Sequence, residues 1–230
     1  MPLDSIDILE KQRGKDYIEV DKTTRLDWDA LREKVKSQGM RNSNTMAIAP
    51  TATIANITGL TQSIEPTYSN LFVKSNLSGE FTVINMHLVD ALKEIDMWDE
   101  VMVYDLKNLN GSLESIARVP EDIKKLFATS FEVEPKWLIE AASRRQKWID
   151  QSQSLNLYVS EPNGKKLDIM YRMAWLRGLK TTYYLRSRSA TTTEKSTITN
   201  MELNAVKTEP KNYDQPEACS IDDPDCEACQ

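Results

Sequence analysis

The strongest constraint on the fold is a strand, a helix and a second strand that follow one another between residues 155 and 185. Residues 155–159, Leu-Asn-Leu-Tyr-Val, alternate as a strand does, and a Pro-Asn-Gly turn follows at 162–164. Apolar residues then recur at helical spacing from Leu167 to Trp175, and Gly178 ends the run. Residues 181–185, Thr-Thr-Tyr-Tyr-Leu, are β-branched or aromatic and favour a second strand. This alternation predicts an α/β fold with mainly parallel pairing.

Local signals place further elements upstream. Asp27 can cap a helix from about Trp28 to Ser37, and the short apolar run 46–49 suits a buried strand. Further helices are expected at residues 86–95, 98–108, from Pro120 onwards and 135–150.

The composition changes after about residue 187. Thr, Ser, Lys, Glu, Asn and Pro dominate from there onwards, and apolar residues are too sparse to offset the entropy of ordering the chain. The sequence therefore predicts a folded domain at residues 1–186 and a flexible tail at 187–230.

Composition also limits the function classes. Hydrophobic residues make up 40% and charged residues 28% of the chain, which is typical of soluble globular proteins. A net charge of -6 argues against a dedicated nucleic-acid binder, since phosphate contacts need clustered Lys and Arg. No apolar run approaches the roughly 20 residues of a membrane helix, and the first residues lack a secretory pattern. We therefore expect a cytoplasmic protein without a membrane or nucleic-acid partner.

Residues 50–55, Pro-Thr-Ala-Thr-Ile-Ala, form the first candidate site. A strand that runs into a helix through small hydroxylated residues presents backbone N–H groups and hydroxyls that can hold a phosphate. The segment lacks the glycine pattern of a P-loop. Taken alone, it favours the simpler interpretation of a helix N-cap built from Thr51 or Thr53, with Gly59 ending the helix.

The second candidate site is the pair Tyr183-Tyr184. Adjacent residues of a strand point to opposite faces, so two rings that meet need a local departure from strand geometry. The simpler interpretation is aromatic filling of a strand. The functional interpretation is redox chemistry, because a tyrosine can carry an electron hole.

The third candidate site is Cys226-Glu-Ala-Cys229. With Cys219 these are the only cysteines, and all lie in the last dozen residues, unlike the spread-out cysteines of a disulfide framework. Two thiols at this spacing can form a small disulfide and exchange it. A complete zinc site is not expected, because zinc takes four ligands and the single histidine, His87, is far away in the sequence. The acidic neighbours should raise the thiol pKa: Asp222, Asp223, Asp225 and Glu227.

Together, these segments resemble the large subunit of class I ribonucleotide reductase, in collinear order over essentially the whole chain. The resemblance implies the C-terminal part of the reductase α/β barrel, followed by the tail. The segments that carry it are Met46-Ala-Ile-Ala-Pro-Thr-Ala-Thr-Ile54, Ser63-Ile-Glu-Pro66, Ser78-Gly-Glu-Phe81, Arg145-Gln-Lys-Trp-Ile-Asp150, Leu176-Arg-Gly-Leu-Lys-Thr-Thr-Tyr-Tyr184 and the terminal Cys-x-x-Cys.

The resemblance implies a role for each candidate site. Tyr183 and Tyr184 would relay a radical between the small subunit and the active site. Cys226 and Cys229 would reduce the active-site disulfide after each turnover, and thioredoxin or glutaredoxin would then reduce the tail. Cys219 receives no role. The residues implied to bind the diphosphate of a ribonucleoside diphosphate substrate are Pro50, Thr51, Ala52, Thr53 and Ile54.

The departures from the family pattern are equally specific. The family needs a thiyl-radical cysteine on a loop of the form Asn-x-Cys-x-Glu, and two more cysteines that reduce the substrate. This sequence contains none of these, nor the upstream allosteric nucleotide sites. We therefore expect a C-terminal portion of ribonucleoside-diphosphate reductase that is inactive without an N-terminal partner. No metal or cofactor is expected in this chain, because the metal-containing small subunit would supply the radical. The alternatives are a thiol-bearing module that captures metal or a redox partner, and a gene remnant.

Overall fold

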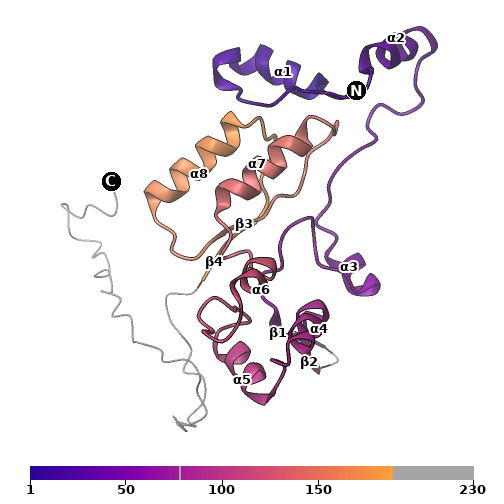
Figure 1. Ribbon diagram of the computed structural model, residues 1–230. Coiled ribbons are helices and arrows are strands. Elements are labelled where there is room, and N and C mark those ends of the chain that lie inside the picture. Colours follow the sequence, from indigo (N-terminus) through magenta and orange to yellow (C-terminus); the bar gives the residue numbers. More distant parts are fainter. Residues whose placement is uncertain (78, 189–230) are drawn as a thin grey trace, which may run out of the picture.

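The computed structural model describes residues 1–77 and 79–188 (Figure 1). The described residues form both helices and strands, in agreement with the predicted α/β class. Among them, strand, helix and strand alternate only between residues 157 and 187, and the prediction of mainly parallel pairing was wrong, because the longer strand pair is antiparallel. The helices are α1 (Asp4–Arg13), the 3-10 helix η1 (Lys15–Tyr17), α2 (Trp28–Gln38), α3 (Ala52–Thr58), α4 (Met86–Glu94), α5 (Glu100–Asn108), α6 (Glu121–Leu126), α7 (Pro135–Gln146) and α8 (Gly164–Leu176). The strands are β1 (Leu71–Asn76), β2 (Gly79–Ile84), β3 (Leu157–Val159) and β4 (Leu185–Ser187).

The predicted strand–helix–strand unit is present in the C-terminal half. Strands β3 and β4 pair in parallel, with Leu157 opposite Leu185, and α8 connects them. Figure 1 shows α7 and α8 side by side next to these strands. Their apolar faces and β3 form one buried core: Leu138, Ile139, Ala142, Leu155, Leu157, Tyr158, Val159, Met170, Ala174 and Leu179.

Strand boundaries differ from the predictions. The strand expected at 181–185 begins only at Leu185, although Tyr183 N–H still donates to the carbonyl of Leu155. The run 46–49 is not a full strand, since Ile48 makes one parallel bridge, to Gln153. In the described part of the chain the strands form two two-stranded sheets and this bridge, with no closed barrel.

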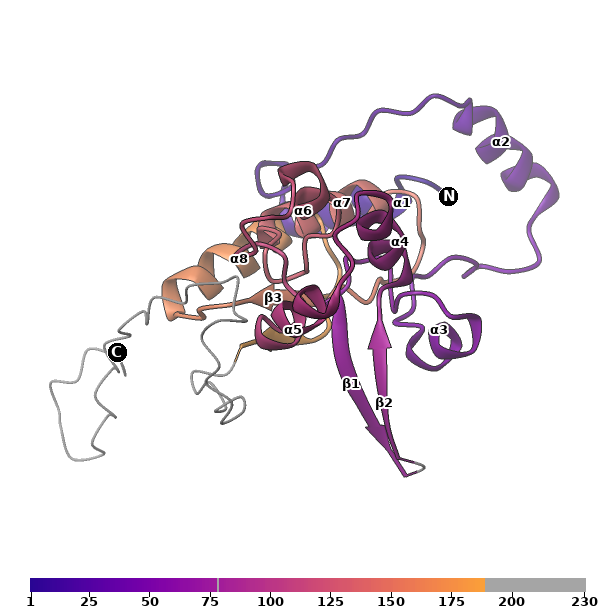
Figure 2. The same ribbon diagram turned by 60° about the horizontal axis from the view of Figure 1, so that its bottom comes forward.

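A second core lies under an antiparallel hairpin that the sequence analysis did not anticipate. Strands β1 and β2 pair from Leu71 opposite Ile84 to Asn76 opposite Gly79, and the hairpin projects from the body of the molecule (Figure 2). Its base rests on α4 and α5, both found close to where they were expected. The core residues are Leu71, Leu88, Leu92, Met102, Leu106, Leu113, Ile116 and Val119.

The N-terminal segment packs against α7 and α8, which the polar sequence did not predict. Leu3 N–H donates to the carbonyl of Lys147 at 2.8 Å, and Glu19 N–H donates to that of Leu176 at 2.8 Å. The helix expected at 135–150 accordingly ends at Gln146. A Cβ on Gly178, which has φ of 70°, would meet Val20 Cγ2 at 2.8 Å, so this close approach requires glycine.

Helix α2 was predicted correctly, including its cap, because Asp27 Oδ1 accepts from Ala30 N–H at 3.0 Å. None of its residues is fully buried, and among its few contacts Arg32 Nη2 donates to Asp4 Oδ1 at 2.6 Å, and the Trp28 and Trp148 ring centroids are 5.9 Å apart. Among the described residues no helix is long and apolar enough to cross a bilayer.

Candidate functional site

An open pocket of about 700 Å³ brings two of the three candidate sites together. Asn44 and three segments line it: Ala47–Pro50, Asp150–Ser154 and Lys180–Tyr183. Pro50 therefore lies on the same pocket as Tyr183, although 132 intervening residues separate them in the sequence. The parallel bridge between Ile48 and Gln153 joins the first two segments, and the hydrogen bond from Tyr183 N–H to the Leu155 carbonyl connects the third.

The two tyrosine rings are in contact. Their centroids are 4.1 Å apart with an interplanar angle of 50°, and Tyr183 OH donates to Tyr184 OH at 3.3 Å. This hydroxyl contact raises the pKa of Tyr183 above its ordinary value. Both side chains are about half exposed, at 47% and 51%, so they do not fill the described core. The interpretation as aromatic filling was therefore wrong, and the departure from strand geometry that the functional interpretation needs is present.

Hydrogen bonds from the neighbouring segment hold the backbone of the pair. Leu155 accepts from Tyr183 N–H at 2.8 Å, and Leu157 N–H donates to the carbonyl of Tyr184 at 2.8 Å. Tyr184 N–H donates to the side-chain oxygen of Asn156 at 3.3 Å. The pair lies directly before β4, and Tyr184 N–H bonds to the Asn156 side chain instead of to a backbone carbonyl.

A buried carboxylate fixes Asn156 in turn. Glu65 is 7% exposed, and it accepts from Asn156 N–H at 2.7 Å, from Asn156 Nδ2 at 3.0 Å and from Tyr158 OH at 3.5 Å. Burial raises the pKa of Glu65 above its ordinary value, although the bonds from Asn156 oppose this. The sequence analysis quoted Glu65 only within a motif. The local sequence shows only a charged residue between Ile64 and Pro66, and this does not indicate that Glu65 is buried or which residues bond to it.

The candidate phosphate loop has a strained backbone. Thr51 adopts a left-handed conformation with φ of 51° and makes no side-chain cap, so the N-cap interpretation was wrong for Thr51, and Thr53 lies within α3. Thr51 Oγ1 instead accepts from Ser63 N–H at 3.1 Å, and Ser63 Oγ donates to the carbonyl of Pro50 at 3.1 Å. Ser63 is itself left-handed, with φ of 61°.

The first turn of α3 is open to a ligand. Helix geometry leaves the N–H groups of Ala52, Thr53 and Ile54 without intrahelical acceptors, and all three residues are exposed. These are the residues that the resemblance implied for phosphate binding.

Asp150 anchors the segment that leads into this loop. Its carboxylate accepts from Thr45 N–H at 2.8 Å, Thr45 Oγ1 at 2.9 Å and Met46 N–H at 3.0 Å. These hydrogen bonds hold the pKa of Asp150 below its usual range, and the bond from the Thr45 N–H has the largest effect. Lys180 Nζ donates to the Asp150 carbonyl at 2.6 Å and connects the anchor to the segment before the tyrosine pair.

The third candidate site, Cys226 and Cys229, lies outside the described residues, as does Cys219. Within the described ranges no group of three His, Cys, Asp or Glu side chains is placed to hold a metal.

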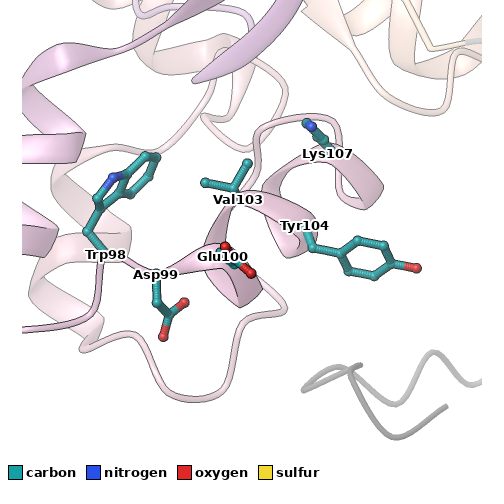
Figure 3. Close-up of a pocket in the computed structure, with 6 residues that line it drawn as sticks. All are labelled: Trp98, Asp99, Glu100, Val103, Tyr104 and Lys107. Carbon is teal, nitrogen blue, oxygen red and sulfur yellow. The ribbon is translucent and has the colours of Figure 1, made fainter. Parts of the chain in front are cut away.

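A separate pocket of about 530 Å³ lies on α5 and contains none of the candidate residues. Figure 3 shows the Trp98 ring and the Val103 side chain on either side of the same space, while Tyr104 points away from Trp98. The lining residues are Trp98, Asp99, Glu100, Val103, Tyr104 and Lys107.

Comparisons with known proteins point to one family. The model of the ribonucleotide reductase barrel domain matches residues 5–185. The ribonucleoside-diphosphate reductase subunit alpha of Chlamydia trachomatis is 51% identical and covers 100% of this chain, which spans 23% of that protein. The Chlamydia muridarum subunit is 59% identical over 86% of this chain and 19% of its own length. The solved class Id ribonucleotide reductase alpha subunit of Actinobacillus ureae has a TM-score of 0.60 and 32% identity, over 69% of this chain and 29% of that one. The chain thus spans about a fifth to a quarter of the curated relatives' length.

Proposed function

The chain belongs to the family of ribonucleotide reductase barrel domains, and we propose that it acts as the C-terminal portion of a ribonucleoside-diphosphate reductase large subunit. In this role it contributes to the conversion of ribonucleotides to deoxyribonucleotides and requires an N-terminal part. That part supplies the cysteines of the active site, since the only cysteines here are Cys219, Cys226 and Cys229.

The observation that carries the proposal is the contact between Tyr183 and Tyr184 beside the pocket that Pro50 also lines. A phenol that loses an electron and a proton becomes a neutral radical, and a second phenol in contact can refill it by giving up its own electron and proton. Ring centroids 4.1 Å apart and hydroxyls 3.3 Å apart suit such an exchange. The pair would relay the radical that the metal-containing small subunit supplies.

The loop at Pro50–Ile54 would bind the substrate diphosphate. Its support is the exposed first turn of α3, whose N–H groups favour an anion, together with the hydroxyl of Thr53. Thr51 shapes the loop through Ser63. Because Pro50, the first residue of the loop, and Tyr183 line one pocket, a nucleotide bound at the loop would lie close to the end of the relay.

The terminal pair Cys226 and Cys229 would carry reducing equivalents. A dithiol at this spacing can attack the active-site disulfide, form a mixed disulfide and leave as the oxidised pair. Thioredoxin or glutaredoxin would then reduce the tail.

Complementation tests this function. The chain is mixed with a large-subunit part that contains Asn-x-Cys-x-Glu, a small subunit, a ribonucleoside diphosphate and reduced thioredoxin, and deoxynucleotide is measured. We expect product from the complex and none from this chain alone. No product from a folded, verified complex would refute the proposal.

A cysteine variant tests the tail in the same assay. Replacement of Cys226 and Cys229 by Ser should stop thioredoxin-driven turnover, while a small dithiol that reaches the active site directly still sustains it. The alternative of a metal-capturing module predicts instead that the variant loses bound metal, which elemental analysis of the purified chain detects.

A further inference from the structure

One short segment, residues 63–65, contacts both the phosphate loop and the residues that hold the tyrosine pair. Ser63 bonds to Pro50 and Thr51 at one end, and Glu65 bonds to Asn156 at the other. We call Ser63-Ile64-Glu65 the strap. Its two ends are two residues apart, so the chain between them reaches at most roughly 7 Å.

The residues that follow the strap are held in place by hydrogen bonds to a buried serine, Ser130. Beyond Glu65, the Pro66 carbonyl accepts from Ser130 Oγ, and Ser130 N–H donates to the carbonyl of Thr67 at 2.8 Å. Ser130 and Glu65 are both buried. A displacement of Ser63 therefore cannot be absorbed by the chain that follows Glu65.

The Ser63 end of the strap involves backbone conformations that non-glycine residues rarely adopt. Ser63 and its partner Thr51 are two of the few non-glycine residues with positive φ, at 61° and 51°. Such backbone persists only where surrounding contacts over-determine it, and here the two residues bond to each other. The phosphate loop thus owes its shape to the strap.

The path from the strap to the rings is a short series of bonds. Glu65 accepts from the backbone and side-chain N–H groups of Asn156, which leaves the Asn156 Oδ1 to accept from Tyr184 N–H. The Asn156 amide cannot rotate to follow Tyr184 without breaking its bond to a buried carboxylate. The backbone of Tyr184 is therefore placed by Glu65.

We infer that the strap couples the phosphate loop to the tyrosine pair, so that a change at Pro50–Thr51 alters the placement of Tyr184. Ser63 and Glu65 act as positioning residues, since neither is assigned contact with substrate. The inference rests on the proposed function for its biological meaning: substrate phosphate at the loop would adjust the relay before the radical arrives. Coupling of this kind is reciprocal, so a change at Glu65 must also alter binding at the loop.

The test places a spectroscopic probe on the rings of the whole chain. Tyrosines are replaced biosynthetically by 3-fluorotyrosine, and the Tyr183 and Tyr184 fluorine resonances are assigned with Tyr→Phe variants. Ser63→Ala removes the bond to Pro50, and Thr51→Val removes the acceptor for Ser63 N–H while keeping the branched shape. Both should shift the Tyr184 resonance without any ligand.

Ser143→Ala is the matched control, because Ser143 Oγ also donates to a backbone carbonyl, that of Arg177 at 2.7 Å, but lies off the path. It should leave the Tyr184 resonance in place. Equal positions of that resonance in wild type, Ser63→Ala and Thr51→Val, with each chain folded by circular dichroism, would overturn the coupling.

The reverse direction uses inorganic pyrophosphate as the probe. Its binding is followed by phosphorus NMR, and Glu65→Gln should change the dissociation constant by about 5-fold or more. An unchanged constant in Glu65→Gln counts against the coupling. If wild type binds no pyrophosphate while Ser63→Ala still moves Tyr184, the proposed phosphate role fails and the coupling stands.

Discussion

The Glu65→Ala substitution gives the sharpest prediction for stability. Glu65 and Asn156 are each 7% exposed, and removal of the carboxylate leaves two buried Asn156 donors without an acceptor. An unsatisfied buried donor costs about 1–3 kcal/mol, so the two together cost about 2–6 kcal/mol. Relief of the buried charge offsets part of this. We expect the free energy of unfolding to fall by about 2–4 kcal/mol.

The assay is urea unfolding at pH 7, followed by tryptophan fluorescence and extrapolated linearly to water. Glu80→Ala is the control, because Glu80 is exposed on β2 and its loss should stay within about 0.5 kcal/mol of wild type. A loss below about 1 kcal/mol for Glu65→Ala would refute the reasoning, since it would mean that water replaces the carboxylate.

The same substitution has a pH dependence with a defined sign. Burial raises the folded-state pKa of Glu65 above the ordinary value of 4.5. The contribution to stability that arises from this shift is fully present below the ordinary value and is lost as the pH rises through the folded-state pKa. The loss in Glu65→Ala should therefore be larger below pH 4.5 than at pH 7.

Three further predictions concern single side chains. Leu106→Ala, at a fully buried position of α5, should lower the free energy of unfolding by about 2–5 kcal/mol in the same urea assay, whereas Leu126→Ala at an exposed position should not. The hydrogen bonds from Arg118 lower the pKa of Asp99 to about 2. The stability that this carboxylate contributes is therefore present above pH 3.8 and is lost as the pH falls through about 2. Arg118→Gln should raise the pKa of Asp99, which an NMR titration measures. Asp150→Asn should shift the amide resonances of residues 45–46, because one of its acceptor oxygens becomes a donor, and unchanged resonances would count against the anchor.

Local chemistry explains why most helices were predictable. Asp27 bonds to Ala30 as an N-cap should, and Pro135 begins α7 as a first-turn proline should. The apolar spacing between Leu167 and Trp175 locates α8. Such signals lie within a few residues of the element that they define.

Strand boundaries and site geometry were less predictable because distant residues set them. The placement of Tyr184 depends on Asn156, and Asn156 depends on Glu65, which is 91 residues away in the sequence. Likewise, Thr51 Oγ1 accepts from the N–H of Ser63, which is 12 residues away, instead of capping α3. The sequence could show that two tyrosines adjoin and that a loop is small and polar, but not which buried group arranges them.

The most direct measurement of the central claim is deoxynucleotide formation by the complemented enzyme with Tyr184→Phe. The substitution keeps the ring but removes the phenol that a radical relay oxidises, so we predict that the complex assembles and yields no product above background. Turnover at the wild-type rate in a verified complex of Tyr184→Phe would contradict the claim that the paired tyrosines carry the radical.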